Sequence, residues 1–379
     1  MATILALTDC VQSLLERCGP LFERIQSESH QLVVVGPQSE RNPSPQGYRH
    51  REVPVNFGFD EPRRMIWLNA MLQGIFDEVE PDLFIGDGPD AVAWGLVSSW
   101  SAQYSVSYVM VHNANTASRA LHEVHDYLTQ SVASLLYRLG DSDDHGLCLD
   151  NDSAYRRCAR RLVGDADGIA ALDPSAVRLQ RYRCRKLPPK TSFLFCAPLV
   201  RPAGVIEYAR AARRIRAQYP SVDFMLAGWP ESGRDGVDPH RIGSWIEQGV
   251  VQYLGHLDDV RDAMGQAAVF VAPSHRPRIC PTELKAMAMG RPLVATRFGS
   301  HRCTVHHSEN GYVVHPGCVD SLEWAMRHFI GQPQLRETMG ANSRKRAVTE
   351  FAASLVTDRL LELMELPKSS VQPPPLPTG

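Results

Sequence analysis

Several features that would assign this chain to a well-marked class of protein are missing from its sequence. No apolar run approaches the ~20 residues that a membrane-spanning helix needs, so we expect no membrane span, although peripheral association with a membrane stays open. The formal net charge of -2 gives no overall attraction to nucleic acid. No Gly-x-Gly-x-x-Gly motif is complete, because Ala91 stands where a third glycine would follow Gly86 and Gly88. This disfavours a nicotinamide-dependent enzyme.

The cysteines give no sign of a disulfide framework or of a standard metal motif. There are nine of them, an odd number, and no two form a Cys-x-x-Cys pair. This usage is typical of a reducing compartment, and we expect a cytoplasmic protein. The first residues carry no basic group ahead of their apolar run, so we interpret residues 3–7 as a first strand and not as part of a signal peptide.

What is present is enough apolar sequence for two α/β domains. The 379 residues, of which 44% are hydrophobic and 22% charged, are typical of a globular protein whose domains each bury a core. Short apolar runs alternate with helix-length amphipathic segments, which predicts parallel sheets with helices on both faces. We expect an N-terminal Rossmann-like domain over 1–188, a C-terminal one over 189–350, a crossing helix over 351–365 and a disordered Pro-rich tail over 366–379.

In the first domain the pattern predicts a parallel sheet with a polar connection. The expected strands are 3–7, 31–36, 82–86, 106–111 and 168–173, with a short strand at 52–55 and helices at 11–25, 65–79 and 91–100. An acidic loop, 140–145, separates two further helices, and the basic stretch 178–190 joins the domains. That basic stretch either attracts phosphates or an acidic partner or is a solvated linker.

The second half carries a more specific pattern. It contains a strand at 192–197, a helix at 205–215, a strand that ends at Gly228, a strand at 269–274 and a helix at 285–292 with the run Ala-Met-Ala-Met-Gly. In order and spacing, residues 193–351 resemble the C-terminal domain of family 4 glycosyltransferases, also called glycosyl transferases group 1, which have the GT-B fold. The resemblance implies two Rossmann-like domains facing across a cleft, a nucleotide-diphosphate sugar as donor, a glycan or small-molecule acceptor and no metal cofactor.

The residues that this family uses to hold the donor phosphates are replaced. The family pattern has an arginine and a lysine in the loop after the first strand of the second domain, where they stabilise the charge of the leaving diphosphate. Here the loop 197–204 reads Ala-Pro-Leu-Val-Arg-Pro-Ala-Gly. Pro198 therefore stands at the arginine position and Ala203 at the lysine position.

The family's pair of glutamates is replaced as well. The Ala-Met-Ala-Met-Gly run fixes the alignment, which sets Pro277 at the first glutamate and Lys285 at the second. A lysine cannot accept a hydrogen bond from a ribose. Arg278 occupies a position where the family has glycine, and Cys303 occupies that of a further glutamate. The resemblance is thus specific in architecture and weak in its chemistry.

The first domain also lacks residues that the family pattern expects. In place of a Gly-rich loop after the first strand stands a segment with Asp9, which repels phosphate unless it is screened. One match remains, since His112 falls where the family keeps a histidine near the reacting sugar, and a structural histidine is the alternative. On the acceptor side the candidates are Asp9, Asp87 and Asn113.

Two interpretations of this mismatch stay open. In the first, the chain is an active glycosyltransferase with a rebuilt donor site, in which cations hold the phosphates and Glu283 serves a sugar hydroxyl. The donor-pocket candidates are Arg201, Gly228, Ser274, His275, Arg276, Arg278 and Lys285. In the second, the chain is a catalytically inactive pseudoenzyme that binds a glycan, a regulatory ligand or a cognate active glycosyltransferase. Binding of a nucleotide sugar favours the first interpretation.

A third interpretation is a metal ion in the former donor pocket. His301, Cys303, His306 and His307 crowd one segment, and sulfur and imidazole ligands suit zinc. Their spacing matches no standard zinc motif, so surface side chains are the alternative. The Asp-x-Asp triplet at 141–143 offers hard oxygens to a divalent ion, with a solvated loop as its alternative.

Overall fold

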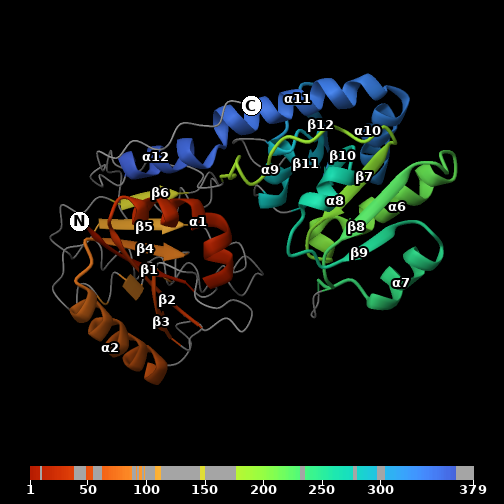
Figure 1. Cartoon of the computed structure of the whole chain (residues 1–379). Coiled ribbons are helices and arrows are strands. Elements are labelled where there is room, and N and C mark those ends of the chain that lie inside the picture. Colours follow the sequence, from red (N-terminus) through yellow and green to blue (C-terminus); the bar gives the residue numbers. More distant parts are fainter. Residues whose placement is uncertain are drawn as a thin grey trace. The chain divides into compact units, whose positions relative to one another are not determined.

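The structure of the chain is a computed structural model (Figure 1). It describes residues 1–8, 11–37, 48–53, 62–87, 91, 94, 95, 98, 107–111, 146–149, 176–230, 235–275, 280–296 and 304–363. The expected strand at 168–173, the acidic loop 140–145 and the tail 366–379 lie outside these residues. No helix within them is long and apolar enough to cross a membrane.

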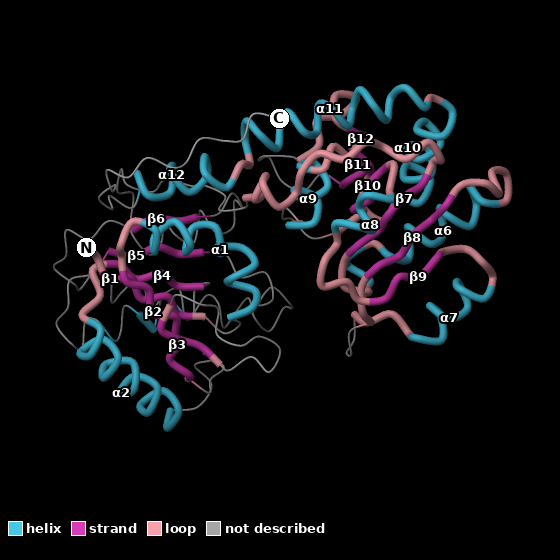
Figure 2. The backbone as a smooth tube through the Cα atoms, viewed as in Figure 1, coloured by secondary structure: helices cyan, strands magenta, loops and turns pink. Residues whose placement is uncertain are grey.

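The chain divides into two compact units. The first comprises residues 1–174 and 356–379, and the second comprises residues 175–355. The division falls within the last helix, α12 (Ala353–Leu363). Each unit has its own parallel sheet (Figure 2), so the expectation of two parallel α/β units is confirmed.

In the described part of the first unit, six strands form one parallel sheet. They are β1 (Thr3–Leu7), β2 (Gln31–Gly36), β3 (Arg49–Glu52), β4 (Leu83–Asp87), β5 (Ser107–Val111) and β6 (Gly146–Leu149). The order across the sheet is β3-β2-β1-β4-β5-β6. Helix α1 (Val11–Ser27) joins β1 to β2, and α2 (Pro62–Val79) joins β3 to β4. Every residue of β4 is buried, as expected for a strand covered on both faces.

The described strands of the second unit also number six and run parallel. They are β7 (Ser192–Cys196), β8 (Asp223–Ala227), β9 (Gln252–Gly255), β10 (Val269–Ala272), β11 (Leu293–Thr296) and β12 (Gly311–Val314), in the order β12-β11-β10-β7-β8-β9. The connections contain the short helix η1 (Arg201–Ala203), α6 (Val205–Arg216), α7 (Pro239–Glu247), α8 (Arg261–Gln266) and α9 (Pro281–Ala288). The unit then continues with α10 (Val319–Gly331) and α11 (Pro333–Glu350).

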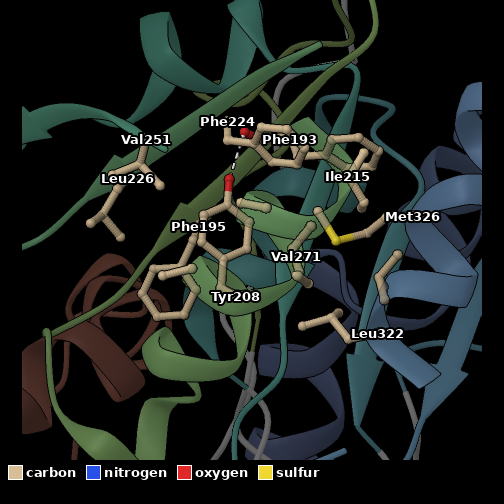
Figure 3. Close-up of a cluster of buried hydrophobic side chains, with 14 of the residues drawn as sticks. Phe193, Phe195, Tyr208, Ile215, Phe224, Leu226, Val251, Val271, Leu322 and Met326 are labelled. Atoms are coloured by element: carbon tan, nitrogen blue, oxygen red, sulfur yellow. Dashed lines mark hydrogen bonds between the residues drawn. The ribbon is translucent and has the colours of Figure 1, made fainter. Parts of the chain in front are cut away.

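Tyr208 of α6 anchors one face of the second sheet (Figure 3). Its ring packs beside Phe195 and Phe224, and its hydroxyl donates to the carbonyl oxygens of Phe193 and Met225, both at 3.0 Å. Complete burial raises the pKa of this hydroxyl well above its usual value. A buried tyrosine that finds acceptors in this way fixes the helix to the start of β7 and β8.

The structure corrects three expectations for individual elements. The short strand expected at 52–55 is β3 (Arg49–Glu52), a polar strand at the sheet edge that pairs through its backbone with β2 alone among the described strands. The helix expected at 285–292 is α9 (Pro281–Ala288), which begins with Pro281 in its first turn and ends ahead of Gly290, whose φ is +78°. The strand β6 was not expected, since its four residues carry no alternating pattern.

Candidate functional site

The candidate site lies at the carboxyl end of the second sheet, where the connections after β7 and β10 diverge. These strands are parallel neighbours. After β7 the chain enters α6, which packs with α10 on the sheet face of Phe193 and Phe195. After β10 it enters α9, which packs with α8 on the opposite face, that of Leu194. Open parallel sheets bind ligands at such a switch point.

The loop after β7 is packed closely against the loop after β10. Gly204 has a φ of +81°, and a Cβ at this position would stand 2.1 Å from the carbonyl oxygen of Pro273, so only glycine fits. Arg201 lies in the same loop with an exposed side chain. Pro198 and Ala203, the two positions where the resemblance expects cations, lie in this loop as well. Arg201 is thus the cation that this loop offers.

Ser274 and His275 connect the two loops. The backbone N–H of His275 donates to the carbonyl oxygen of Pro202 at 2.7 Å, and Ser274 Oγ donates to the same oxygen at 3.4 Å. Nε2 of His275 lies 3.8 Å from Oε2 of Glu207, which stands in the first turn of α6. The switch point therefore brings together three of the expected donor-pocket residues: Arg201, Ser274 and His275.

The loops after β8 and β9 add an aromatic surface to this edge of the sheet. Gly228 has a φ of +138°, and a Cβ there would stand 1.9 Å from the carbonyl oxygen of Ala197. The hydroxyl of Tyr253 donates to the carbonyl oxygen of Gly228 at 2.8 Å. Trp229 is 38% exposed, and its ring meets that of His256 edge-on at a centroid distance of 4.6 Å. The exposed indole is a surface on which a planar ring can stack.

Glu283 lies in the first turn of α9 and is buried. Thr304 Oγ1 donates to Glu283 Oε2 at 2.6 Å, and the Thr304 side chain is buried too. Burial raises the pKa of the Glu283 carboxyl to about 7, and the hydrogen bond from Thr304 opposes this rise. The carboxyl is therefore close to half-protonated at neutral pH. Its proposed contact with a sugar hydroxyl stays a prediction.

Lys285 lies one turn away from the start of α9, near the Tyr182 ring and the Cys196 thiol. Its Nζ stands 5.8 Å from the centroid of the Tyr182 ring, a cation–π contact. Burial raises the pKa of the Cys196 thiol to about 12, Cys280 raises it further and Lys285 lowers it. Cys196 is thus a neutral thiol at physiological pH. Lys285 as a whole is half-buried.

In the first unit, Asp87 lies at the corresponding switch point, at the carboxyl end of the sheet. It ends β4, the neighbour of β1 at the centre of that sheet. Thr8 Oγ1 donates to Asp87 Oδ2 at 2.6 Å, and both side chains are buried. The role of Asp87 on the acceptor side stays a prediction. Asp9, His112 and Asn113 lie outside the described residues, as do Arg276, Pro277 and Arg278 of the second unit.

The described residues contain no group of three or more histidine, cysteine, aspartate and glutamate side chains able to hold a metal ion. His306 lies beside Glu309 instead, with 3.1 Å between Nδ1 and Oε2. Nδ1 of His307 accepts a backbone N–H at 3.2 Å. His301 and Cys303, the other two candidates, lie outside the described residues.

Sequence reasoning did not single out Glu207, Trp229 or Thr304. Glu207 occupies an ordinary position of a predicted amphipathic helix, and its partner His275 is 68 residues further along the chain. Thr304 is likewise distant in sequence from Glu283. A sequence pattern that would have found Trp229 exists, since it directly follows the strand-ending Gly228. The contacts of Glu207 with His275 and of Thr304 with Glu283 depend on which distant segments pack together in the fold, and the sequence does not show this.

Comparison with known proteins shows what this part of the chain is similar to. Residues 190–332 match the model of the family described as glycosyl transferases group 1. The capsular polysaccharide biosynthesis glycosyltransferase CapM of Staphylococcus aureus is 24% identical over 162 residues, which are 43% of this chain and 42% of CapM. The chain spans less than half of the length of CapM and of two further curated relatives that it matches.

Solved structures extend the likeness to the whole chain and show its fold. Sucrose-phosphate synthase from Thermosynechococcus elongatus superposes with a TM-score of 0.75 at 17% identity, over 96% of this chain and 98% of that one. Anabaena Alr3699/HepE in complex with UDP gives 0.74 at 17% identity, over 96% and 100%. The chain has the GT-B fold of glycosyltransferases, as the sequence predicted.

Proposed function

We propose that this chain is a glycosyltransferase that takes a sugar from a nucleotide-diphosphate donor and passes it to a glycan or small-molecule acceptor. One observation carries the proposal: the segment that matches the family, residues 190–332, contains the switch point where exposed polar and aromatic side chains gather. HepE has been solved with UDP, with UDP-glucose and with UDP and glucose. CapM takes part in capsular polysaccharide biosynthesis. These relatives suggest the donor class and a glycan acceptor.

Different residues at and near the switch point contact different parts of the donor in this proposal. The guanidinium of Arg201 is exposed and offers charge-assisted hydrogen bonds to a phosphate. Trp229 offers a face for the base. Ser274 contributes a hydroxyl next to both loops. This arrangement replaces the arginine and lysine that the resemblance expects at Pro198 and Ala203.

Two residues are proposed for the reacting sugar. His112 is carried over from the family pattern. Glu283 can accept from a sugar hydroxyl through Oε1, or through Oε2 if its hydrogen bond with Thr304 is exchanged, and the carboxyl is buried with that partner. A donor that reaches Glu283 should therefore change the ionisation of this carboxyl.

Calorimetric titration with UDP, GDP, ADP and their glucose derivatives tests the proposal. We expect the native chain to bind at least one of them, and to release the nucleoside diphosphate from its sugar when a suitable acceptor is present. Arg201→Gln should weaken binding at least about tenfold, the equivalent of about 1.4 kcal/mol. The matched control is Arg213→Gln, in the last turn of α6, where the guanidinium donates to Gln248 at 2.7 Å.

A native chain that binds none of these compounds would contradict the proposal. The inactive binding subunit then becomes the preferred interpretation, and co-purification with an active glycosyltransferase would support it. If instead Arg201→Gln and Arg213→Gln bind equally well, the donor site is elsewhere although the activity class stands.

A further inference from the structure

Two polar side chains meet at the switch point without a hydrogen bond between them. Nε2 of His275 and Oε2 of Glu207 are 3.8 Å apart. Both atoms are buried, and neither has a hydrogen-bond partner among the described residues. A buried charge or polar atom without a hydrogen-bond partner lowers the stability of the fold, and such groups are frequent at functional sites. We call Glu207 and His275 the carboxylate–imidazole pair.

The pair is held in place by three loops at the same edge of the sheet. Glu207 stands in the first turn of α6, after β7. His275 follows β10, and its backbone N–H is fixed by the carbonyl of Pro202 at 2.7 Å. Gly317 follows β12 with a φ of +70°, and a Cβ there would stand 3.7 Å from Cε1 of the His275 ring. The ring thus lies between a carboxylate and a neighbouring loop.

One side of the imidazole remains accessible. The His275 side chain keeps 34% of its surface, against 15% for Glu207. Because Nε2 itself is buried, the exposed part of the ring belongs to its other atoms. Nδ1 forms no hydrogen bond with a described residue. The structure therefore offers one ring nitrogen to the carboxylate and the other to a ligand.

This arrangement suits an anion. A histidine whose two nitrogens both carry protons has two N–H donors. The carboxylate of Glu207 accepts from one of them once the 3.8 Å gap closes, and this sets the orientation of the ring. The second N–H then points to the ligand. Arg201, in the loop that also contains Pro202, adds a permanent positive charge to the same edge.

We propose that the carboxylate–imidazole pair binds a phosphate group of the donor, with His275 as the donor of the hydrogen bond and Glu207 as its positioning residue. The proposal rests on the proposed function, since the nucleotide-diphosphate donor supplies the phosphate. His275 and Glu207 stand at neither of the positions where the resemblance expects the phosphate-binding cations, so in this proposal the chain holds the same group with different residues.

The test is calorimetry with whichever of UDP, GDP and ADP binds the native chain most tightly, beside the matching nucleoside without phosphates. We expect binding of the nucleotide to be weakened at least about tenfold in His275→Gln, and by a smaller factor in Glu207→Gln. His275→Lys should restore affinity for the nucleotide. All these variants should bind the nucleoside with the same affinity as the native chain.

The matched control is His306→Gln. His306 and Glu309 also form an imidazole–carboxylate contact, at 3.1 Å, but both side chains are exposed and precede β12, at the opposite edge of the sheet. This variant should bind as the native chain does. Unchanged nucleotide affinity in His275→Gln would overturn the inference and leave the proposed function standing. So would an equal loss of nucleoside and nucleotide, which indicates a structural role. A native chain that binds no nucleotide overturns the proposed function itself.

Discussion

The buried carboxyl of Glu283 makes stability depend on pH in a direction opposite to that of most carboxylates. Its pKa is about 7 in the folded chain, against the ordinary 4.5. Below pH 4.5 the group is protonated in both states and has no effect. Between these values the unfolded chain loses the proton while the folded chain keeps it, so stability falls as the pH rises. Above pH 7 the loss is complete, and it amounts to about 3 kcal/mol at about 1.4 kcal/mol per pKa unit.

Glu283→Gln removes this dependence, since the amide oxygen still accepts from Thr304 and carries no charge. We expect the variant to gain about 3 kcal/mol over the native chain when the pH is raised from 4.5 to 8.5. Urea unfolding followed by circular dichroism at both pH values measures the difference. The control is Glu247→Gln, an exposed position in α7, which should follow the native chain. If Glu283→Gln differs from the native chain by the same amount at both pH values, the carboxyl is not neutral near pH 6 and the reasoning fails.

Three further predictions concern packing and reactivity. Gly204→Ala should lower the free energy of unfolding in urea by more than about 2 kcal/mol, because its Cβ would overlap a carbonyl oxygen. Gly249 also has a positive φ but has open space around it, so Gly249→Ala should lower this free energy by only about 1–2 kcal/mol. Equal losses would contradict the close approach at Gly204. Tyr208→Phe should lower stability by about 1 kcal/mol, and an unchanged calorimetric melting temperature would contradict the role of its hydroxyl. Iodoacetamide at pH 8 should modify exposed Cys184 well before half-buried Cys196, whose thiol pKa is raised. Similar rates by peptide mass spectrometry would show that the Cys196 thiol is ionised.

The architecture could be predicted from the sequence because the central strands are continuous apolar runs. The segments 192–197 and 269–274 were expected as strands, and β7 and β10 occupy them. Strands at the edges of the sheets were harder to predict from the sequence. The polar β3 has no apolar run to mark it, and β6 is only four residues long. Each pairs through its backbone with a neighbouring strand.

The site was only partly predictable for a related reason. Ser274 and His275 were found because Ser274 ends a predicted strand and His275 follows it, and a switch point lies at strand ends. Glu207 was not, because its role depends on a contact between loops of two strands that are adjacent in the sheet and separated in the chain. The burial of Glu283 was also hidden, since its motif position does not reveal that Thr304 covers the carboxyl.

A crystal structure of the chain grown with the nucleoside diphosphate that it binds most tightly tests the donor site most directly. We predict phosphate oxygens within hydrogen-bond distance of Arg201 and His275, at the carboxyl ends of β7 and β10, and the base beside Trp229. A nucleotide bound at another place, or phosphates that contact neither of those two side chains, would contradict the donor site described for this chain.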